Sequence, residues 1–463
     1  MLLTSKYPAD NFRDRALATT VRERRERLAN LISFPVLLWS GQRPSRNFPS
    51  NTYPFRASSH FLYFAGIQLE NAAIRLADGK LELFADDPDP AIALWHGEMP
   101  KRHEIARLIG ADAAFPLAEL ESRTADAATV AVQDPETRSR QERLLGRSLH
   151  GQLDRKLAKA IVTLRLSHDP SALAQLRQAA AVSVKAHKAG MAATPDASTE
   201  AEVRGAMEGT IIAHNMTTAY NSIVTVRGEV LHNEHYQNPL QPGQLLLADV
   251  GAETPAGWAS DITRTWAVGG RFSPTQRDLY EVVLAAHDRA IEAVRPGVEY
   301  RDLHRLATQV IAEGLVELGI GRGDPEGLVE RDVPALFFPH GVGHLLGLDV
   351  HDMEDLGDLA GYAEGRQRSD RPGLRFLRLD RPVQAGMVFT IEPGFYQVPG
   401  ILDRPETRSR HGKAVNWERL AQFADVRGIR IEDDVLVTEE GSEVLTAALP
   451  TNVEAIEGLV QEG

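Results

Sequence analysis

Four short apolar segments in the second half of the chain each carry a carboxylate at or near one end. The acids are Asp249, Asp261, Glu392 and Glu432. A carboxylate at the end of a buried strand is costly unless it is paired or bound to a metal ion. One such acid is readily explained as a cap or a salt-bridge partner. Four of them, beside the histidines described next, are hard to explain in that way.

Three histidines fall within residues 340–351, which also contain three glycines. His340 and His344 are four residues apart, a spacing that would place both on one face of a helix. Gly341 and Gly343 lie near them, and glycine is unfavourable in a helix interior. We therefore expect a loop whose backbone closely approaches another group. Clustered imidazoles indicate a metal site or an acid–base site, and the alternative is a polar turn with solvated histidines.

The available donor atoms restrict the kind of metal. The chain of 463 residues contains no cysteine, which excludes disulfides and thiolate zinc sites. Several carboxylates and one imidazole can hold two divalent ions that share a bridging water. Carboxylate-rich ligation favours harder ions such as Mn²⁺. A water on such ions has its pKa lowered towards neutrality, which suits hydrolysis of an amide or an ester.

Length and charge exclude several classes of protein. A chain of 463 residues is too long for one ordinary core, so two domains are expected. The net charge of −13 argues against a nucleic-acid binder. No stretch is apolar for long enough to span a membrane, and the first residues lack the apolar core of a signal peptide. We therefore expect a cytoplasmic protein without membrane or nucleic-acid partners.

The first 165 residues alternate strand and helix patterns and predict an α/β domain. Residues 12–31 predict a surface helix, and residues 36–39 and 61–64 predict short buried strands. Residues 72–85 alternate with period two around Asp-Gly, which is typical of a type I′ hairpin. Residues 166–170, Leu-Ser-His-Asp-Pro, indicate a domain boundary.

Beyond this boundary, helices alternate with the acid-bearing strands. Helices are expected over residues 171–190, after a capping box of Thr199 and Glu202, from Ser273-Pro274, and over residues 300–318. His287 lies beside the apolar stripe of the third helix and is interpreted as a structural or surface histidine. Each half of this region supplies two of the acids, which hints at internal duplication.

Five motifs give the chain a family resemblance. They are Ala248-Asp249-Val250-Gly251, Ser260-Asp261-Ile262-Thr263-Arg264-Thr265, the stretch 340–351, Thr390-Ile391-Glu392-Pro393-Gly394 and Arg430-Ile431-Glu432-Asp433-Asp434. In kind and order they resemble the pita-bread metallopeptidases, the family of methionine aminopeptidase, Xaa-Pro aminopeptidase and prolidase. Residues 55–66 carry a weaker resemblance to the creatinase-type N-terminal domain of the proline-directed members. Methionine aminopeptidases lack that domain, which argues against them.

The resemblance implies a fold and a set of metal ligands. The expected fold is an α/β N-terminal creatinase-like domain, residues 1–167, followed by an α+β pita-bread catalytic domain with pseudo-twofold symmetry, residues 168–463. By this resemblance Asp249 chelates one metal ion, and Asp261 and Glu432 bridge two. His344 and Glu392 complete the second coordination sphere.

The resemblance also implies catalytic roles. Glu392 would act as a base towards water and pass the proton to the leaving nitrogen. His351 would donate a hydrogen bond to the scissile carbonyl or the developing oxyanion. His340 would line the pocket for the residue after the scissile bond, and His232 would lie across the metal ions. Arg430 would orient the ligands, because its position two residues from Glu432 places both on one face of a strand.

The implied function is metal-dependent removal of an N-terminal residue that precedes proline. Two divalent ions per subunit are expected, with Mn²⁺ first and Zn²⁺ or Co²⁺ as alternatives, in a homodimer or higher homo-oligomer. The alternatives are an Xaa-Pro dipeptidase (prolidase) and a metal-free binding protein of the same fold. Residues 353–381 and 401–419, of which the first resembles eukaryotic-type prolidases, are expected to flank the active site. They would decide whether a long peptide or only a dipeptide fits.

Overall fold

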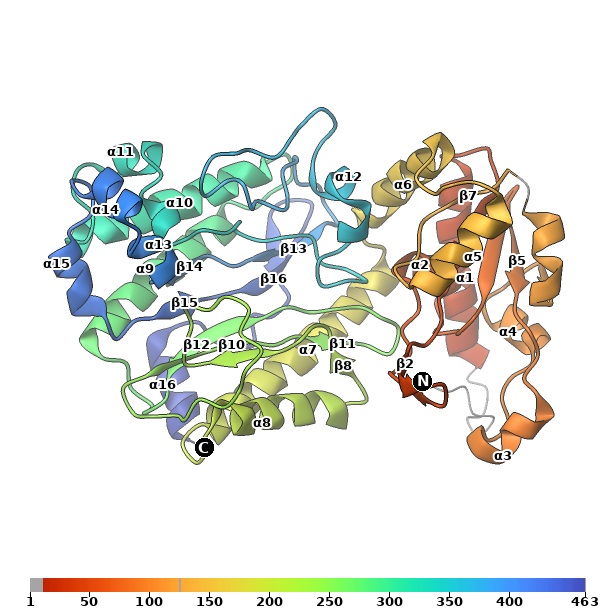
Figure 1. The fold of residues 1–463 in the computed structure, drawn as a ribbon, viewed down its shortest axis with the longest axis horizontal. Coiled ribbons are helices and arrows are strands. Elements are labelled where there is room, and N and C mark those ends of the chain that lie inside the picture. Colours follow the sequence, from red (N-terminus) through yellow and green to blue (C-terminus); the bar gives the residue numbers. More distant parts are fainter. Residues whose placement is uncertain (1–10, 125, 463) are drawn as a thin grey trace. The chain divides into compact units, whose positions relative to one another are not determined.

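The computed structural model describes residues 11–124 and 126–462, which form two compact units (Figure 1). Unit 1 contains the described residues up to Arg165 together with Pro255–Gly257. Unit 2 contains Leu166–Thr254 and the described residues from Trp258 onwards. Across both described ranges, no helix has the length and apolar character needed to cross a bilayer.

Unit 1 is an α/β structure built on a mixed five-stranded sheet in the order β6-β5-β4-β1-β7. Its strands are β1 (Val36–Trp39), β2 (Ser45–Phe48), β3 (Asn51–Thr52), β4 (Ala73–Ala77), β5 (Lys80–Phe84), β6 (Ala113–Phe115) and β7 (Ala128–Thr129), and its helices are α1 (Asn11–Ala29), α2 (Ser59–Ala65), α3 (Ala93–His96), α4 (Arg102–Leu108), α5 (Pro135–Leu145) and α6 (Gln152–Arg165). The predicted hairpin is confirmed, since Asp78 and Gly79 both adopt positive φ between β4 and β5.

One expectation for unit 1 was wrong. Residues 61–64 lie in helix α2, which ends at Gly66 in the left-handed conformation. Every residue of α2 is buried, so the apolar run carries no helical periodicity that would distinguish it from a buried strand. The predicted helix over residues 12–31 is present as α1, and Arg24 and Arg25 on its inner side are buried and donate to backbone carbonyls of Tyr63 and Ile109.

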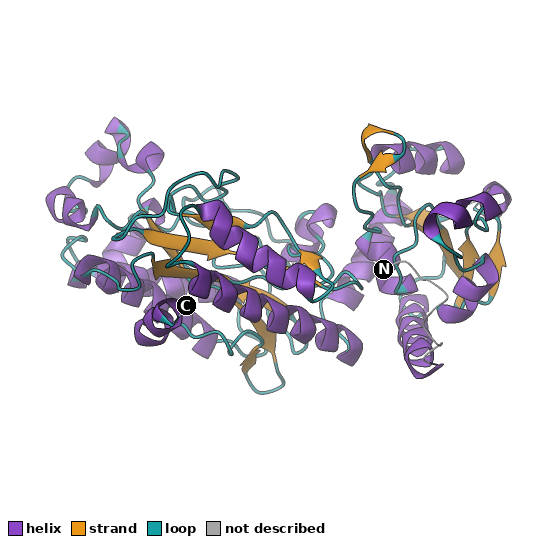
Figure 2. Ribbon diagram, turned by 90° about the horizontal axis from the view of Figure 1, so that it is seen from below, coloured by secondary structure: helices purple, strands orange, loops and turns teal. Residues whose placement is uncertain are grey.

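One arrangement, a helix pair followed by a three-stranded sheet, occurs twice in unit 2. A packed helix pair, α7 (Pro170–Ala193) and α8 (Glu200–Ala213), precedes the three-stranded antiparallel sheet β12-β10-β9, and a second pair, α9 (Pro274–Glu292) and α10 (Tyr300–Glu317), precedes the sheet β13-β16-β17. These strands are β9 (Ile223–Thr225), β10 (Leu245–Asp249), β12 (Thr263–Ala267), β13 (Val388–Ile391), β16 (Asp433–Val437) and β17 (Ser442–Val444). Figure 2 shows long helices lying across the strands. The hint of duplication therefore has a structural counterpart.

Short elements complete unit 2. The strand pairs are β8 (Thr217–Thr218) with β11 (Ala252–Glu253) and β14 (Gly394–Tyr396) with β15 (Gly428–Arg430); the helices are α11 (Pro325–Glu330), α12 (Asp358–Gly361), α13 (Pro399–Leu402), α14 (Pro405–His411), α15 (Trp417–Leu420) and α16 (Val453–Gln461). An isolated bridge between Thr263 and Glu432 joins the first sheet to the segment that enters the second. The acids at these strand ends are thereby brought together.

The helix starts agree with the sequence at one position and differ at another. Ser273 caps α9 in the predicted capping box, with Gln276 completing it. The Thr199 side chain does not cap α8. Its hydroxyl instead donates to Glu202, whose carboxylate also accepts from the backbone N–H of Ser198.

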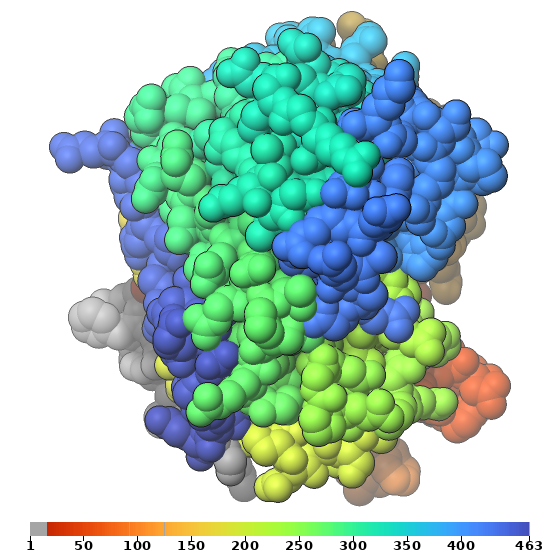
Figure 3. All heavy atoms as spheres, turned by 90° about the vertical axis from the view of Figure 1, so that its left-hand side faces the viewer, coloured from red at the N-terminus to blue at the C-terminus, as the bar shows by residue number. Residues whose placement is uncertain are grey.

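Residues 399–420 contain helices α13 to α15 on the face of unit 2 shown in Figure 3, beside the segment that follows α10. Asn416 N–H donates to the carbonyl of Ile320 at 2.8 Å, and Gly321 forms a bridge with Val415. These contacts hold the long polar segment against the turn between α10 and α11.

A buried ion cluster ties the second sheet to the helices. Arg264 is fully buried and its Nη2 donates to both Asp433 carboxylate oxygens, at 2.9 and 3.1 Å. His287 on α9 places Nε2 3.1 Å from the same carboxylate. Burial acts to raise the pKa of Asp433, but the Arg264 charge and the His287 hydrogen bond hold it below its usual range. His287 is thus a structural histidine, as expected.

Replacing Asp433 by Asn should strongly destabilise unit 2. The substitution leaves the Arg264 charge buried without its counter-charge, and breaking such a pair costs about 3–5 kcal/mol. Calorimetry on metal-free protein should show a lower Tm for the transition of unit 2. Glu443→Gln is the matched control, because the Arg177–Glu443 pair is exposed and contributes about 1 kcal/mol or less. Equal Tm values for the two variants would contradict the cluster's role.

His304 on α10 makes the stability of unit 2 depend on pH. Its ring is buried, with the Phe338 ring centroid 5.4 Å away. Burial lowers the pKa of His304 to about 4, against a hydrogen bond to the Gly373 backbone that acts to raise it. The unfolded chain, with an imidazole pKa near 6.5, therefore binds this proton more readily.

Native stability should consequently fall as the pH falls from about 6.5 towards about 4. Between about pH 7.5 and pH 5 the loss from this one group is about 2 kcal/mol. His304→Gln should remove that part of the loss, measured as a smaller shift in Tm between the two pH values with EDTA present. The exposed His214→Gln serves as control and should keep the parent's pH dependence. A His304→Gln profile identical to the parent's would disprove the assignment.

Candidate metal centre

One cavity of about 360 Å³ in unit 2 brings together every site residue predicted from the sequence. These residues are His232, Asp249, Asp261, His340, His344, His351, Glu392, Arg430 and Glu432. They come from both sheets and from the loop 340–351, which is not helical, as the glycines predicted. Their roles stay predictions, but their convergence is a property of the fold.

The four acids reach the cavity because strand ends meet there. Asp249 is the last residue of β10, and Asp261 lies two residues before β12, its antiparallel neighbour. Glu392 directly follows β13, and Glu432 lies between β15 and β16. Each carboxylate is thus held by a strand whose apolar residues are packed in the interior.

Asp249 is fixed by two side chains. Arg430 Nη2 lies 2.5 Å from Asp249 Oδ2. The Tyr220 hydroxyl lies 2.6 Å from Asp249 Oδ1 and also contacts the Asp261 carboxylate. Tyr220 therefore links the acid that ends β10 to the acid that precedes β12.

Arg430 holds a second branch of this network. Its Nε donates to Thr263 Oγ1 at 3.0 Å, and the same hydroxyl donates to Glu432 Oε2 at 2.6 Å. Its Nη1 donates to the Tyr396 hydroxyl at 2.9 Å. Arg430 is 4% exposed, so its charge is held in the interior of unit 2.

The carboxylates crowd one another in a buried space. Burial, followed by the neighbouring carboxylates, raises the pKa of Asp261 and Glu432 well above the usual range. Burial also raises the pKa of Glu392 to about 8, although the Arg430 charge acts in the opposite direction. Full ionisation of all these acids therefore requires more positive charge than Arg430 supplies.

His344 offers one nitrogen to the acids. Its Nδ1 lies 3.1 Å from the carbonyl oxygen of Leu345, which assigns the proton to Nδ1. Its Nε2 lies 3.4 Å from Asp261 Oδ2 and 3.6 Å from Glu392 Oε1. Burial holds the pKa of His344 well below 6.5, so the ring is neutral with its lone pair towards the acids.

The loop reaches this position through a close backbone approach. A Cβ atom on Gly343 would lie 2.0 Å from the carbonyl oxygen of Thr390 and 2.3 Å from the Tyr300 hydroxyl. Only glycine fits there, which is the close approach that the sequence predicted. The Thr390 N–H in turn donates to the His344 carbonyl at 2.9 Å.

The donor set fits divalent cations. Asp261, His344 and Glu432 present ligand atoms that all lie within 4.8 Å of one another. Carboxylate oxygens with one neutral imidazole suit Mn²⁺ and Zn²⁺, and cations would supply the positive charge that the acids require. Asp249 and Glu392 line the same cavity and extend the donor set.

The other histidines differ in their surroundings. His340 Nδ1 contacts the Gly341 carbonyl and Nε2 lies 2.9 Å from the Tyr396 hydroxyl, so neither ring nitrogen is left open. Burial lowers the pKa of His340 to about 3 and that of His232 below its usual value. The His351 ring centroid lies 4.0 Å from that of His344.

Part of the site was not found from the sequence. Tyr220 lies outside the recognised motifs and precedes a short strand, so nothing in its surroundings marked it as a carboxylate partner. Thr263 belongs to a quoted motif, but its hydrogen bond to Glu432 depends on the bridge between distant segments. Glu354 also escaped notice, although its spacing of three from His351 is one that allows contact.

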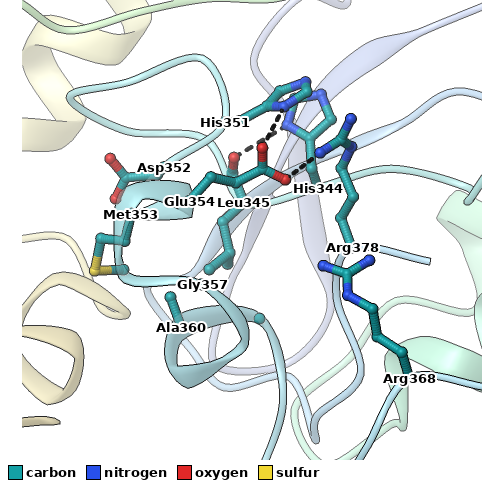
Figure 4. Close-up of a pocket in the computed structure, with 11 residues that line it drawn as sticks. His344, Leu345, His351, Asp352, Met353, Glu354, Gly357, Ala360, Arg368 and Arg378 are labelled. Atoms are coloured by element: carbon teal, nitrogen blue, oxygen red, sulfur yellow. Dashed lines mark hydrogen bonds and ion pairs between the residues drawn. The ribbon is translucent and has the colours of Figure 1, made fainter. Parts of the chain in front are cut away.

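Segment 353–381 borders the cavity, as expected. Arg368, Phe376 and Arg378 line it, and the neighbouring hollow adds Glu354 (Figure 4). The described lining residues of the cavity include none from 401–419. The segment 401–419 contacts residues 318–322, between α10 and α11, and that it flanks the site stays a prediction.

Two family models match the chain. The model of metallopeptidase family M24 matches residues 174–439, and that of the aminopeptidase P N-terminal domain matches residues 21–133. Together they account for most of the chain in the order expected from the sequence.

Similar proteins span nearly the full length. A probable Xaa-Pro aminopeptidase of Aspergillus clavatus is 32% identical over 99% of this chain and 98% of its own. The human Xaa-Pro dipeptidase is 32% identical over 91% of this chain and 87% of its own. The structure of a Pseudomonas aeruginosa aminopeptidase matches with a TM-score of 0.79 and 27% identity, covering 96% of this chain and 98% of its own.

These matches agree with the fold described above, an N-terminal α/β domain followed by a pita-bread catalytic domain. An M24 model that covers more than half of the chain, and relatives above 30% identity over almost all of it, identify the family. The chain belongs to metallopeptidase family M24, with an N-terminal domain of the aminopeptidase P type.

Proposed function

We propose that the protein is an Xaa-Pro aminopeptidase that uses two divalent metal ions per subunit. The observation that carries the proposal is the convergence of four carboxylates, three of them buried, and His344 Nε2 on one cavity. The relatives named Xaa-Pro aminopeptidase support the substrate class, peptides with proline in second position. A homodimer or higher homo-oligomer in the cytoplasm completes the proposal.

Five residues that line the cavity, Asp249, Asp261, His344, Glu392 and Glu432, would hold the two ions. The bound ions, with Mn²⁺ expected and Zn²⁺ or Co²⁺ as alternatives, supply Lewis acidity that lowers the pKa of water and polarises a carbonyl.

Glu392 is the proposed proton carrier. It follows β13, has its side chain 16% exposed and lines the cavity, so it can meet both a water and a peptide. It takes the proton from the attacking water and passes it to the leaving proline nitrogen. The leaving nitrogen becomes an amine, so a proton must be supplied to it as the bond breaks.

The histidines bind and orient the peptide. His351 donates a hydrogen bond to the carbonyl oxygen as negative charge develops on it. His340, held by Tyr396 at 2.9 Å, presents its ring as a wall for the proline side. His232 lines the cavity beside Leu231, where it would help to stabilise the developing oxyanion.

A specific observation favours a second candidate function, Xaa-Pro dipeptidase. Arg368 and Arg378 line the cavity, with Phe376 beside them. A guanidinium group pairs well with a carboxylate, and the free carboxylate of a dipeptide lies one residue beyond the scissile bond. The human relative carries the dipeptidase name.

Chelation followed by reloading tests the metal assignment. Dialysis against EDTA should abolish hydrolysis of Arg-Pro-Pro, and Mn²⁺ should restore it with two ions bound per chain by elemental analysis. Asp261→Asn should lower the bound metal, because a bridging carboxylate is lost. Glu392→Gln should lower kcat by about 10²–10⁴-fold. Full activity in EDTA, or an unchanged metal content in Asp261→Asn, would refute the assignment, and Glu443→Gln is the control.

Substrate comparison separates the two functions. With Mn²⁺ present, we expect cleavage of Arg-Pro-Pro, which has a peptide tail beyond the proline. Cleavage of Ala-Pro alone would assign the dipeptidase function instead, with the arginines of segment 353–381 as the recognition element. Initial rates with both peptides at equal concentrations provide the measurement. Loss of both activities in Glu392→Gln confirms that one site is responsible.

A further inference from the structure

A carboxylate behind the cavity connects two of its lining residues. Glu354 Oε2 lies 3.0 Å from His351 Nδ1, and Glu354 Oε1 accepts a hydrogen bond from Arg378 Nη1. Figure 4 shows the carboxylate between the imidazole ring and the guanidinium group. His351 and Arg378 line the main cavity, and Glu354 lines the adjoining hollow.

We propose that Glu354 is a positioning residue that couples the orientation of His351 to the availability of Arg378 for a substrate carboxylate. This inference rests on the proposed peptidase function and extends it to the recognition of the substrate's carboxyl end. Glu354 acts only through its two neighbours, and its two oxygens serve one neighbour each.

The bond to His351 decides which ring nitrogen faces the substrate. Because Nδ1 is engaged by Glu354, Nε2 is the nitrogen left for a peptide carbonyl. The carboxylate thereby fixes the orientation of the ring, as in other acid–histidine pairs. Without Glu354, the ring would be free to turn away from the His344 ring beside it.

The bond to Arg378 decides how the cavity receives anions. Glu354 is ionised: partial burial acts to raise its pKa, but the hydrogen bond and charge of His351, with the charge of Arg378, lower it to about 2. The Arg378 side chain is 38% exposed. A peptide carboxylate that binds Arg378 must therefore share it with Glu354.

The local backbone is built to hold Glu354 in place. Met353 is fully buried in the left-handed conformation, with φ of 61°, which a residue other than glycine adopts at a cost. The chain turns there, so that Glu354 N–H donates back to the His351 carbonyl at 3.3 Å. A strained turn that places one carboxylate beneath a site residue is consistent with function rather than with packing alone.

Glu354→Gln separates the two effects. The amide keeps the shape but loses the charge, and its NH₂ group opposes the Arg378 donors. We expect kcat to fall by about tenfold or more, as for loss of groups that orient a reacting imidazole. We expect KM for a dipeptide with a free carboxylate to fall as well, because Arg378 loses its competing anion. With the carboxyl-amidated dipeptide, only kcat should fall.

Asp358→Asn is the matched control. Asp358 pairs with the other cavity arginine, Arg368, at 2.8 Å and comes from the same segment. The substitution Asp358→Asn should leave kcat unchanged. Bound metal should equal the parent's in both variants, which shows that a fall in kcat is not loss of ions.

A double-mutant cycle provides the structural control. Arg378→Ala should lower kcat in the parent but not in the Glu354→Gln background, because both act through one carboxylate. Additive effects would overturn the proposal, and so would a parental kcat in Glu354→Gln.

Binding to metal-free protein tests the coupling without catalysis. Titration calorimetry should show Ala-Pro binding more tightly to Glu354→Gln than to the parent, with no difference for the amidated peptide. Equal affinities for Ala-Pro would overturn the proposal. A parent that binds as expected but cleaves no Xaa-Pro peptide would instead refute the proposed function.

Discussion

Unit 2 must hold several carboxylates of like charge close together in one cavity, and the rest of its structure depends on this constraint. Four carboxylates lie in one cavity, and burial together with mutual repulsion raises the pKa of three of them. The protein offsets part of this cost with Arg430, with the hydroxyls of Tyr220 and Thr263, and with the strands that fix each acid. The remainder calls for cations, which is why a metallopeptidase site has this composition.

A second set of buried charges, Arg264 with Asp433, holds the backbone segments that carry these acids together. Arg264 donates to the carbonyl of Glu432 at 2.7 Å and to that of Thr263 at 3.0 Å, while its Nη2 pairs with Asp433. The carbonyl groups of the two bridged strands are thus bound by one guanidinium group. The acids inside the cavity and the salt bridge behind it alternate along the strand, since successive side chains point to opposite faces.

Local sequence patterns were sufficient to predict many of the helices and strands. Asp78-Gly79 predicted its hairpin because both residues tolerate positive φ, and Ser273-Pro274 predicted a helix start because serine and proline suit those two positions. The acids at strand ends were visible because charge beside apolar runs is unusual. The prediction of a strand at residues 61–64 was wrong, because a fully buried helix shows no alternation of apolar and polar residues that would identify it.

What could not be predicted depends on distant contacts. The hydroxyl of Tyr220 meets Asp261 from 41 residues away, and Thr263 meets Glu432 from 169 residues away. No local pattern encodes such a pair. Glu354 could have been noticed from its spacing to His351, but its second partner, Arg378, lies 24 residues further along the chain.

The bridge between Thr263 and Glu432 also has a consequence for the order of events in biosynthesis. Arg430 and Asp249 are separated by 181 residues, so a ribosome must release almost the whole of unit 2 before the cavity can close. Contacts of such long range form late in folding. A nascent chain therefore lacks the complete donor set until Glu432 has been synthesised and the two bridged segments have met.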